Sequence, residues 1–146
     1  MEPVSLSYLV ATLALALTFG GMTFFSAVMA PLVFAKLPLK VAGPFMRQVF
    51  PWYYLTMGAA VLIALTALML GAGSSALWEA ALAALVLTGF VFSRQVLMPR
   101  INQARDAEIL GEFGAGRRFR RLHLVSVVIN ALQWVAVLTV LIRILL

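Results

Sequence analysis

The side chains best suited to chemistry in this sequence lie on one short stretch near the C-terminus. They follow one another at intervals of three, four and three residues, and they are His123, Ser126, Asn130 and Gln133, with Trp134 beside them. At about 100° per residue, an α-helix would carry the four polar residues within roughly 80° of arc. An imidazole, a hydroxyl and two amides on one face can bind a ligand by hydrogen bonds. We treat these four residues, called the polar stripe below, as the candidate site.

The single histidine, His123, is the best placed of these residues for metal or acid–base chemistry, but little around it supports catalysis. The sequence contains no cysteine, which excludes thiolate metal sites, iron–sulfur clusters and thiol nucleophiles. It shows no paired carboxylates, no phosphate-binding glycine loop and no Ser/His/Asp set. The sequence therefore favours a non-enzymatic protein with no catalytic residue and no required cofactor. A haem- or metal-binding redox protein that uses His123 stays open as an alternative.

The composition places the polar stripe in a membrane protein. Of the 146 residues, 64% are hydrophobic and only 11% are charged, against about 25% charged in soluble domains. A bilayer-spanning helix needs about 20 mostly apolar residues. Four stretches meet this requirement, at residues 6–34, 52–70, 77–98 and 122–142. Their apolar runs are continuous and do not alternate, so we expect an all-α integral membrane protein, a four-transmembrane-helix bundle in one domain over residues 1–146.

The positive charges predict how this bundle is oriented. Ten of the eleven Lys and Arg residues lie at the end of the third span or in the segments 35–51 and 99–121, and Arg143 alone lies on the other side. Basic loops stay in the cytoplasm. We therefore expect a bacterial inner-membrane protein with both termini in the periplasm.

The densest basic cluster precedes the fourth span and consists of Arg117, Arg118, Arg120 and Arg121. In a membrane protein such a cluster sets the topology and contacts anionic lipid headgroups. A nucleic-acid partner would need a separate soluble module, for which the chain has no room. The net charge of +6 thus indicates a membrane surface and not nucleic acid.

Small residues and prolines predict how the spans pack. Helices associate in lipid through small residues. The first span carries such residues at helical spacing, at Thr12, Ala16, Gly20, Thr23, Ala27 and Ala30. The second span carries Ala60, Ala64, Ala67 and Gly71. We expect a kink at Pro31, a second span that begins at Trp52 with Pro51 in the first helical turn, and a tight hairpin over Gly71–Ala76.

The polar stripe has two interpretations. Its side chains either join the bundle by interhelical hydrogen bonds or line a pocket for a ligand. Trp134 lies in mid-span, where its indole N–H needs a partner or a cavity. Arg94, near the end of the third span, either reaches the cytoplasmic headgroups or turns inward toward His123.

Several segments carry a family resemblance over nearly the whole chain. They are TFGGMTFFSAVMAPLVF, VFPWYY, MPRIN and RFRRLHLVSVVIN, in this order. The chain resembles the bacterial four-span membrane domain of unknown function that is related to transmembrane-protein-205-like proteins. The resemblance implies the four-helix fold and singles out Arg100, Asn102, His123, Ser126 and Asn130.

The leading functional hypothesis is a polytopic membrane protein that binds or helps to move a small ligand. Its candidate binding residues are Arg94, Arg100, Asn102, His123, Ser126, Asn130, Gln133 and Trp134. The alternatives are the redox protein described above and a structural subunit of a larger membrane complex. A homo-oligomer is compatible with each of them.

Overall fold

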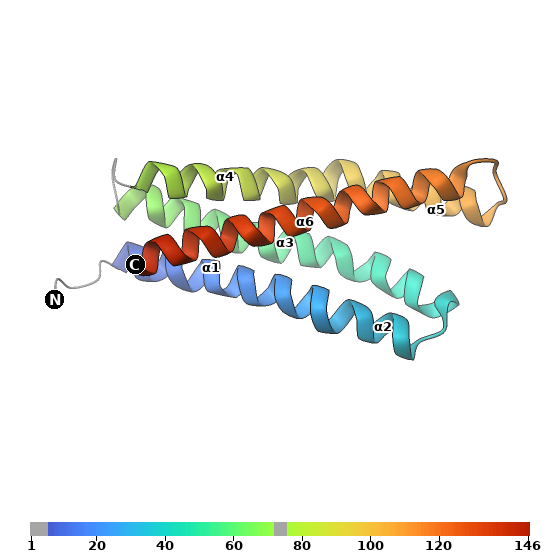
Figure 1. Ribbon diagram of the computed structural model, residues 1–146, viewed down its shortest axis with the longest axis horizontal. Coiled ribbons are helices and arrows are strands. Elements are labelled where there is room, and N and C mark those ends of the chain that lie inside the picture. Colours follow the sequence, from blue (N-terminus) through green and yellow to red (C-terminus); the bar gives the residue numbers. More distant parts are fainter. Residues whose placement is uncertain (1–5, 72–75) are drawn as a thin grey trace.

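The computed structural model describes residues 6–71 and 76–146, and these residues form helices and no strand. Four long rods lie side by side (Figure 1). In chain order they are α1 (Leu6–Phe24) with η1 (Phe25–Met29) and α2 (Ala30–Lys36), α3 (Leu39–Gly71), α4 (Leu77–Phe92) with η3 (Ser93–Leu97) and α5 (Met98–Ile109), and α6 (Ala115–Leu145). Each rod is long and apolar enough to cross a membrane. The prediction of a four-helix, multi-pass membrane protein is confirmed.

The second rod begins earlier than the apolar run predicted. Helix α3 begins at Leu39, so most of the predicted loop 35–51 is helical. The carbonyl of Pro38 accepts the first N–H bonds, from Val41 at 2.8 Å and Ala42 at 2.9 Å. The expectation that Pro51 opens the span is wrong, because Pro51 lies inside α3. Hydropathy marks where apolar residues end, whereas a helix continues as long as its backbone bonds are met.

The second predicted loop, 99–121, is also largely helical. The third rod continues through α5 to Ile109, and α6 begins at Ala115. The turn between them contains Gly111 and Gly114, both with a φ of 79°. Only glycine adopts this left-handed backbone without strain. The hairpin predicted at Gly71–Ala76 lies mostly outside the described residues.

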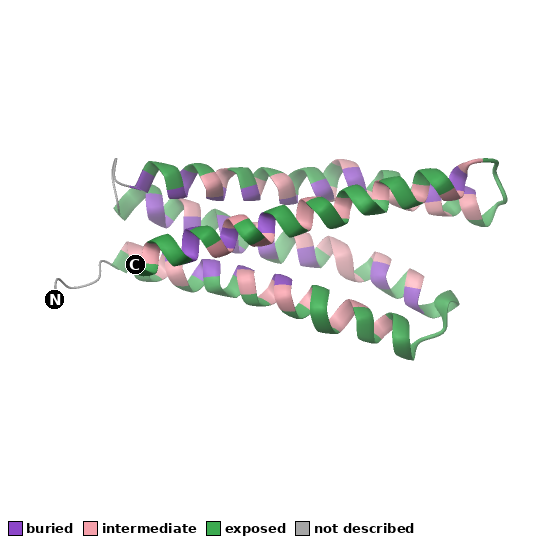
Figure 2. Ribbon diagram, in the orientation of Figure 1, coloured by how far each residue is buried: buried purple, intermediate pink, exposed green. Residues whose placement is uncertain are grey.

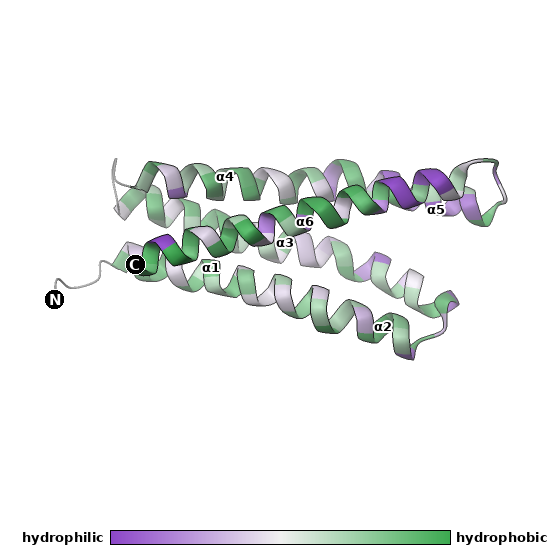
Figure 3. Cartoon of the chain, viewed as in Figure 1, coloured by the Kyte–Doolittle hydropathy of each residue, from purple (hydrophilic) through white to green (hydrophobic). Residues whose placement is uncertain are grey.

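The rods have 31 to 33 residues, about 45–50 Å of helix against a hydrocarbon core of about 30 Å. Large apolar side chains such as Leu13, Leu62, Leu85 and Leu132 are exposed on the outer faces (Figure 2). Hydrophilic residues gather at the end with the α5–α6 turn (Figure 3). This pattern fits rods whose apolar lengths lie in lipid and whose basic ends project from it.

The packing face of the first rod is not the one that its small residues predicted. Gly20 is exposed, and a Cβ added there would meet no atom within 4 Å. The buried residues of α1 are Ala11, Ala14, Leu15, Thr18 and Met22. The neighbouring Gly21 allows the close approach, because its added Cβ would lie 2.8 Å from the Met57 side chain. Small residues occur on both faces of α1, so their spacing alone did not identify the packed face.

Three of the four packing residues predicted in the second rod are buried. They are Ala60, Ala64 and Ala67. Gly71 is exposed, although a Cβ added there would meet the side chain of Ser7. This alanine face of α3 packs in the closed part of the bundle.

The bundle is closed near the start of α1 and opens toward the other end of that rod. There α2 diverges from α6 and packs mainly against α3 (Figure 1). No residue of η1 or α2 is buried. In η1 the N–H of Ala30 bonds to the carbonyl of Phe25, a π-type bond that precedes Pro31. The proline thus follows a local widening of the helix, a feature common at functional sites.

Candidate functional site

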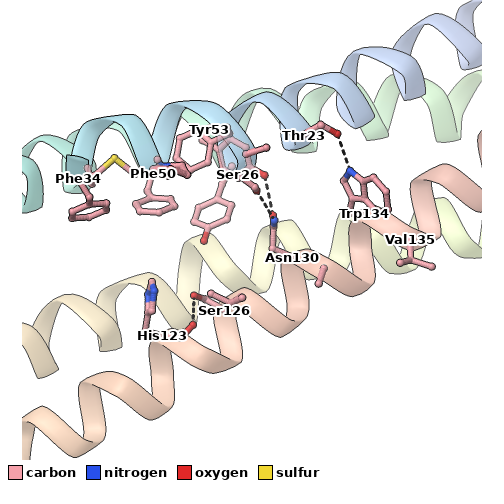
Figure 4. Close-up of a pocket in the computed structure, with 18 residues that line it drawn as sticks. Thr23, Ser26, Phe34, Phe50, Tyr53, His123, Ser126, Asn130, Trp134 and Val135 are labelled. Carbon is pink, nitrogen blue, oxygen red and sulfur yellow. Dashed lines mark hydrogen bonds between the residues drawn. The ribbon is translucent and has the colours of Figure 1, made fainter. Parts of the chain in front are cut away.

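The opening between the first and fourth rods holds a cavity of about 760 Å³. One wall is α6, which contributes His123, Ser126, Asn130 and Trp134. Apolar side chains such as Phe34 and Phe50 make most of the remaining surface (Figure 4). A volume of this size, mostly apolar with a few polar groups, is typical of small-molecule sites.

Asn130 is the central polar residue of the cavity wall. Its Oδ1 accepts a hydrogen bond from the hydroxyl of Tyr53, at 2.9 Å, and its Nδ2 donates to Oγ of Ser26, at 3.2 Å (Figure 4). Tyr53 belongs to α3 and Ser26 to η1, so one amide connects three rods. Ser26 is exposed and Asn130 is half-buried, so this polar group borders the cavity and is not sealed in the core.

Trp134 marks the deep end of the cavity. Its indole N–H donates to Oγ1 of Thr23 on α1, at 2.8 Å, and its ring lies 4.9 Å from that of Phe19. The sequence left open whether this mid-span indole meets a partner or a cavity, and in the structure it has a partner and also lines the cavity. The bond brings α6 against α1 where the cavity ends.

Gln133 belongs to the stripe but not to the cavity. Its side chain is buried, and Nε2 donates to the carbonyl of Val86 on α4, at 2.8 Å. Gly89 leaves room for this amide, since a Cβ there would lie 2.7 Å from Nε2. Gln133 therefore joins α6 to α4, whereas Asn130 faces the opening.

The other end of the stripe has fewer hydrogen bonds. Ser126 donates to the carbonyl of His123 in its own helix, at 2.7 Å. His123 is exposed, and its ring stacks on Phe119 with centroids 5.9 Å apart. Within the described residues, the imidazole has no hydrogen-bond partner. No group of three or more His, Cys, Asp or Glu that could hold a metal occurs among them either.

A second cavity, of about 360 Å³, adjoins the first and shares Phe50, His123 and Ser126 with it. Its lining reaches Arg47 on α3 and Arg105 on α5. The two cavities together extend from the middle of the bundle to its basic end.

Both arginines of the second cavity are held by carboxylates. Arg47 pairs with Asp106 at 2.7 Å and also donates to the backbone carbonyl of Asn102, at 3.4 Å. Arg105 pairs with Glu108 at 2.5 Å. Asn102 lines this cavity together with His123 and Ser126 of the polar stripe.

The remaining predicted site residues lie elsewhere. Arg94 is half-buried, and its Nε donates to the carbonyl of Pro51 at 3.4 Å. Arg100 is exposed on α5. Neither residue lines the two cavities. The four arginines of the basic cluster, Arg117, Arg118, Arg120 and Arg121, are exposed at the same end of the molecule.

Sequence reasoning missed the partners of Asn130. Neither Tyr53, which is buried inside the bundle, nor Ser26 was identified from the sequence as a candidate site residue. Thr23, the partner of Trp134, was expected only to be a small packing residue. The available signal was Pro31, since a proline near the end of a rod indicates irregular backbone nearby, and such backbone often accompanies a site.

The fold and its side opening define a multi-pass helical membrane protein with a cavity between its helices. The chain belongs to the family described as a domain of unknown function (DUF4149), which matches residues 13–109. This match confirms an uncharacterised family and ends before α6, which carries the stripe. The search of curated proteins and the search of solved structures gave no match.

Proposed function

We propose that this protein binds a small ligand that enters sideways from the lipid, between α2 and α6. The observation that carries the proposal is the position of Asn130, a polar residue at the edge of a largely apolar cavity of about 760 Å³. Polar groups in hydrocarbon are costly unless they are paired or serve a function. Gln133 on the same helix is buried, whereas the bond from Asn130 to the exposed Ser26 borders the cavity, so a ligand can reach this polar group.

The surroundings of Asn130 support a site that can open and close. Its two partners lie on α3 and η1, and η1 contains the π-type bond before Pro31. A ligand that accepts a hydrogen bond from Nδ2 of Asn130 replaces the bond of 3.2 Å that this atom donates to the exposed Ser26. The exchange costs little, because interhelical hydrogen bonds in membranes average only about 0.6 kcal/mol.

The first prediction compares the two amides of the stripe. The variants Trp52→Phe and Trp78→Phe leave Trp134 as the only tryptophan. In nanodiscs, 12-bromododecanol should quench the fluorescence of Trp134, because its bromine lies near the indole when the probe is bound. Part of the quenching should saturate as the probe concentration rises, as binding to a site does. Asn130→Leu should weaken this binding about tenfold, because the ligand loses a hydrogen-bond partner worth about 1 kcal/mol or more. Fluorescence titration measures the effect.

Gln133→Leu is the matched control, because it removes the same functional group from a position outside the cavity. It should lower thermal stability and leave binding of the probe unchanged. Purely linear quenching in the parent protein, or equal loss of binding in both variants, would contradict the proposal.

We also propose that the protein lies in a bacterial inner membrane with the basic ends of its rods in the cytoplasm. The support is the charge distribution, since ten of eleven Lys and Arg residues belong to the end with the α2–α3 and α5–α6 turns. The clustered arginines there suit anionic lipid headgroups. We also propose a relation to transmembrane-protein-205-like proteins, which is supported by the segments TFGGMTFFSAVMAPLVF, VFPWYY, MPRIN and RFRRLHLVSVVIN.

The second prediction tests this orientation. Alkaline phosphatase, which is active only in the periplasm, should be active when fused after Leu146 and inactive when fused within the 110–114 turn. The reason is the retention of basic segments in the cytoplasm. Green fluorescent protein fluoresces in the cytoplasm but not after export in unfolded form. Its fusions at the same two positions should therefore give the reverse pattern. Activity at the turn would overturn the orientation.

A further inference from the structure

The two adjoining cavities differ in chemistry from one end to the other. The first cavity, which contains Trp134, is lined mostly by aromatic and small apolar side chains. The second cavity is also lined mostly by apolar side chains, but at the basic end of the molecule its lining includes Arg47, Arg105 and Asn102. A ligand that fills both cavities is therefore apolar at one end and polar at the other.

The end of the molecule that holds the second cavity carries an excess of positive charge beyond the two arginines of the lining. Arg47 and Arg105 are each paired with a carboxylate, of Asp106 and of Glu108, and neither carboxylate residue lines the cavity. This end of the molecule as a whole has ten Lys and Arg residues and three carboxylates. Its potential therefore attracts anions and repels cations.

Ring contacts extend this cationic surface toward the polar stripe. The guanidinium of Arg105 lies 5.3 Å from the ring centre of Phe119, and Phe119 stacks on His123. These three side chains come from α5 and α6, which pack against each other. The stack places a guanidinium and an imidazole along one side of the second cavity, where both can donate hydrogen bonds to an anion.

We infer that the ligand is an anionic amphiphile of the bilayer, with its chain beside Trp134 and its headgroup at Arg47, Arg105 and His123. This inference rests on the proposed function and specifies the ligand class for the same site. The side opening admits a chain from the lipid phase, and the basic end lies where headgroups lie. A neutral hydrocarbon would gain nothing from the positive potential of the basic end, and a cationic amphiphile would meet repulsion.

The test compares three probes that have the same chain and different headgroups. They are 12-bromododecyl phosphate, 12-bromododecanol and 12-bromododecyl trimethylammonium. Each is titrated into the protein with Trp134 as its only tryptophan, in nanodiscs of unbrominated phosphatidylcholine. The phosphate probe should bind at least about tenfold more tightly than the alcohol, because hydrogen bonds to a charged group are the stronger ones. The ammonium probe should bind more weakly than the alcohol.

Two sets of variants locate the headgroup. Arg47→Gln with Arg105→Gln should reduce the preference for phosphate over the alcohol to less than about threefold. Saturable binding of the alcohol by this variant shows that the cavity is intact. Arg100→Gln removes the same charge from an exposed position outside both cavities and should preserve the preference.

Each further outcome has a definite meaning. Equal saturable binding of all three probes overturns the anionic headgroup and leaves the proposed function standing. No saturable binding of any probe overturns both. If native mass spectrometry shows a dimer in which no probe binds, a second copy of the chain fills the opening, and the inference is wrong.

Discussion

Replacing Arg143 by leucine should lower the thermal stability of the protein in detergent more than other single substitutions outside the core. Nε of Arg143, in the last turn of α6, donates to Oε1 of Glu79 in the first turn of α4, at 2.6 Å. Glu79 is only 7% exposed, so the substitution leaves a buried carboxylate without its cation. Removal of one partner from a buried pair costs about 3–5 kcal/mol. Since the Arg143 side chain is 53% exposed, we expect the lower end of that range.

Two further variants distinguish the loss of the ion pair from the loss of packing contacts made by the Arg143 side chain. Arg143→Lys keeps the charge and should retain most of the stability. Glu79→Gln combined with Arg143→Leu should be more stable than Arg143→Leu alone, because no unpaired charge remains. A double variant that is no more stable than the single one would show that the pair is not the cause.

Replacing Gly89 by alanine should also destabilise the bundle strongly, although alanine is the better helix former. The new Cβ would lie 2.7 Å from Nε2 and 3.0 Å from Cδ of Gln133, which is buried and bonded to Val86. Overpacking of this kind costs about 1–3 kcal/mol. Gly20→Ala is the matched control, because its Cβ meets no atom and the change should stabilise by up to about 1 kcal/mol. Thermal unfolding in detergent measures both.

A double-mutant cycle makes the mechanism at Gly89 explicit. Gln133→Ala removes the amide that the new methyl group would meet. The combination of Gly89→Ala with Gln133→Ala should therefore be less destabilised than the sum of the two single variants, by about 1 kcal/mol. Strict additivity would show that Gly89 and Gln133 do not interact as the structure indicates.

The sequence by itself determined that the chain is a four-helix membrane protein. With no water in the bilayer core, four continuous apolar runs must form helices, whatever their neighbours are. It also placed the polar residues of α6 on one face, because a helix repeats every 3.6 residues. Both conclusions depend on local chemistry alone, and the structure confirms the helices.

Element boundaries needed more than hydropathy. The apolar run of the second span starts near Trp52, whereas α3 starts at Leu39 and includes Pro44 and Pro51. Charged residues end an apolar run without ending a helix. The projecting helical ends matter, because they carry Arg47 and Arg105 to the second cavity.

Only the tertiary structure decided which faces meet. Small residues on both faces of α1 offered two packing surfaces, and the buried one contains Leu15 and Met22. The partners Tyr53 and Asn130 are 77 residues apart, and Glu79 and Arg143 are 64 apart. Such pairs depend on how the rods are arranged around one another. Lipid is as apolar as the helix surfaces, so the hydrophobic effect does not favour one arrangement over another. Packing and a few hydrogen bonds make that choice, and with it the cavity between α2 and α6.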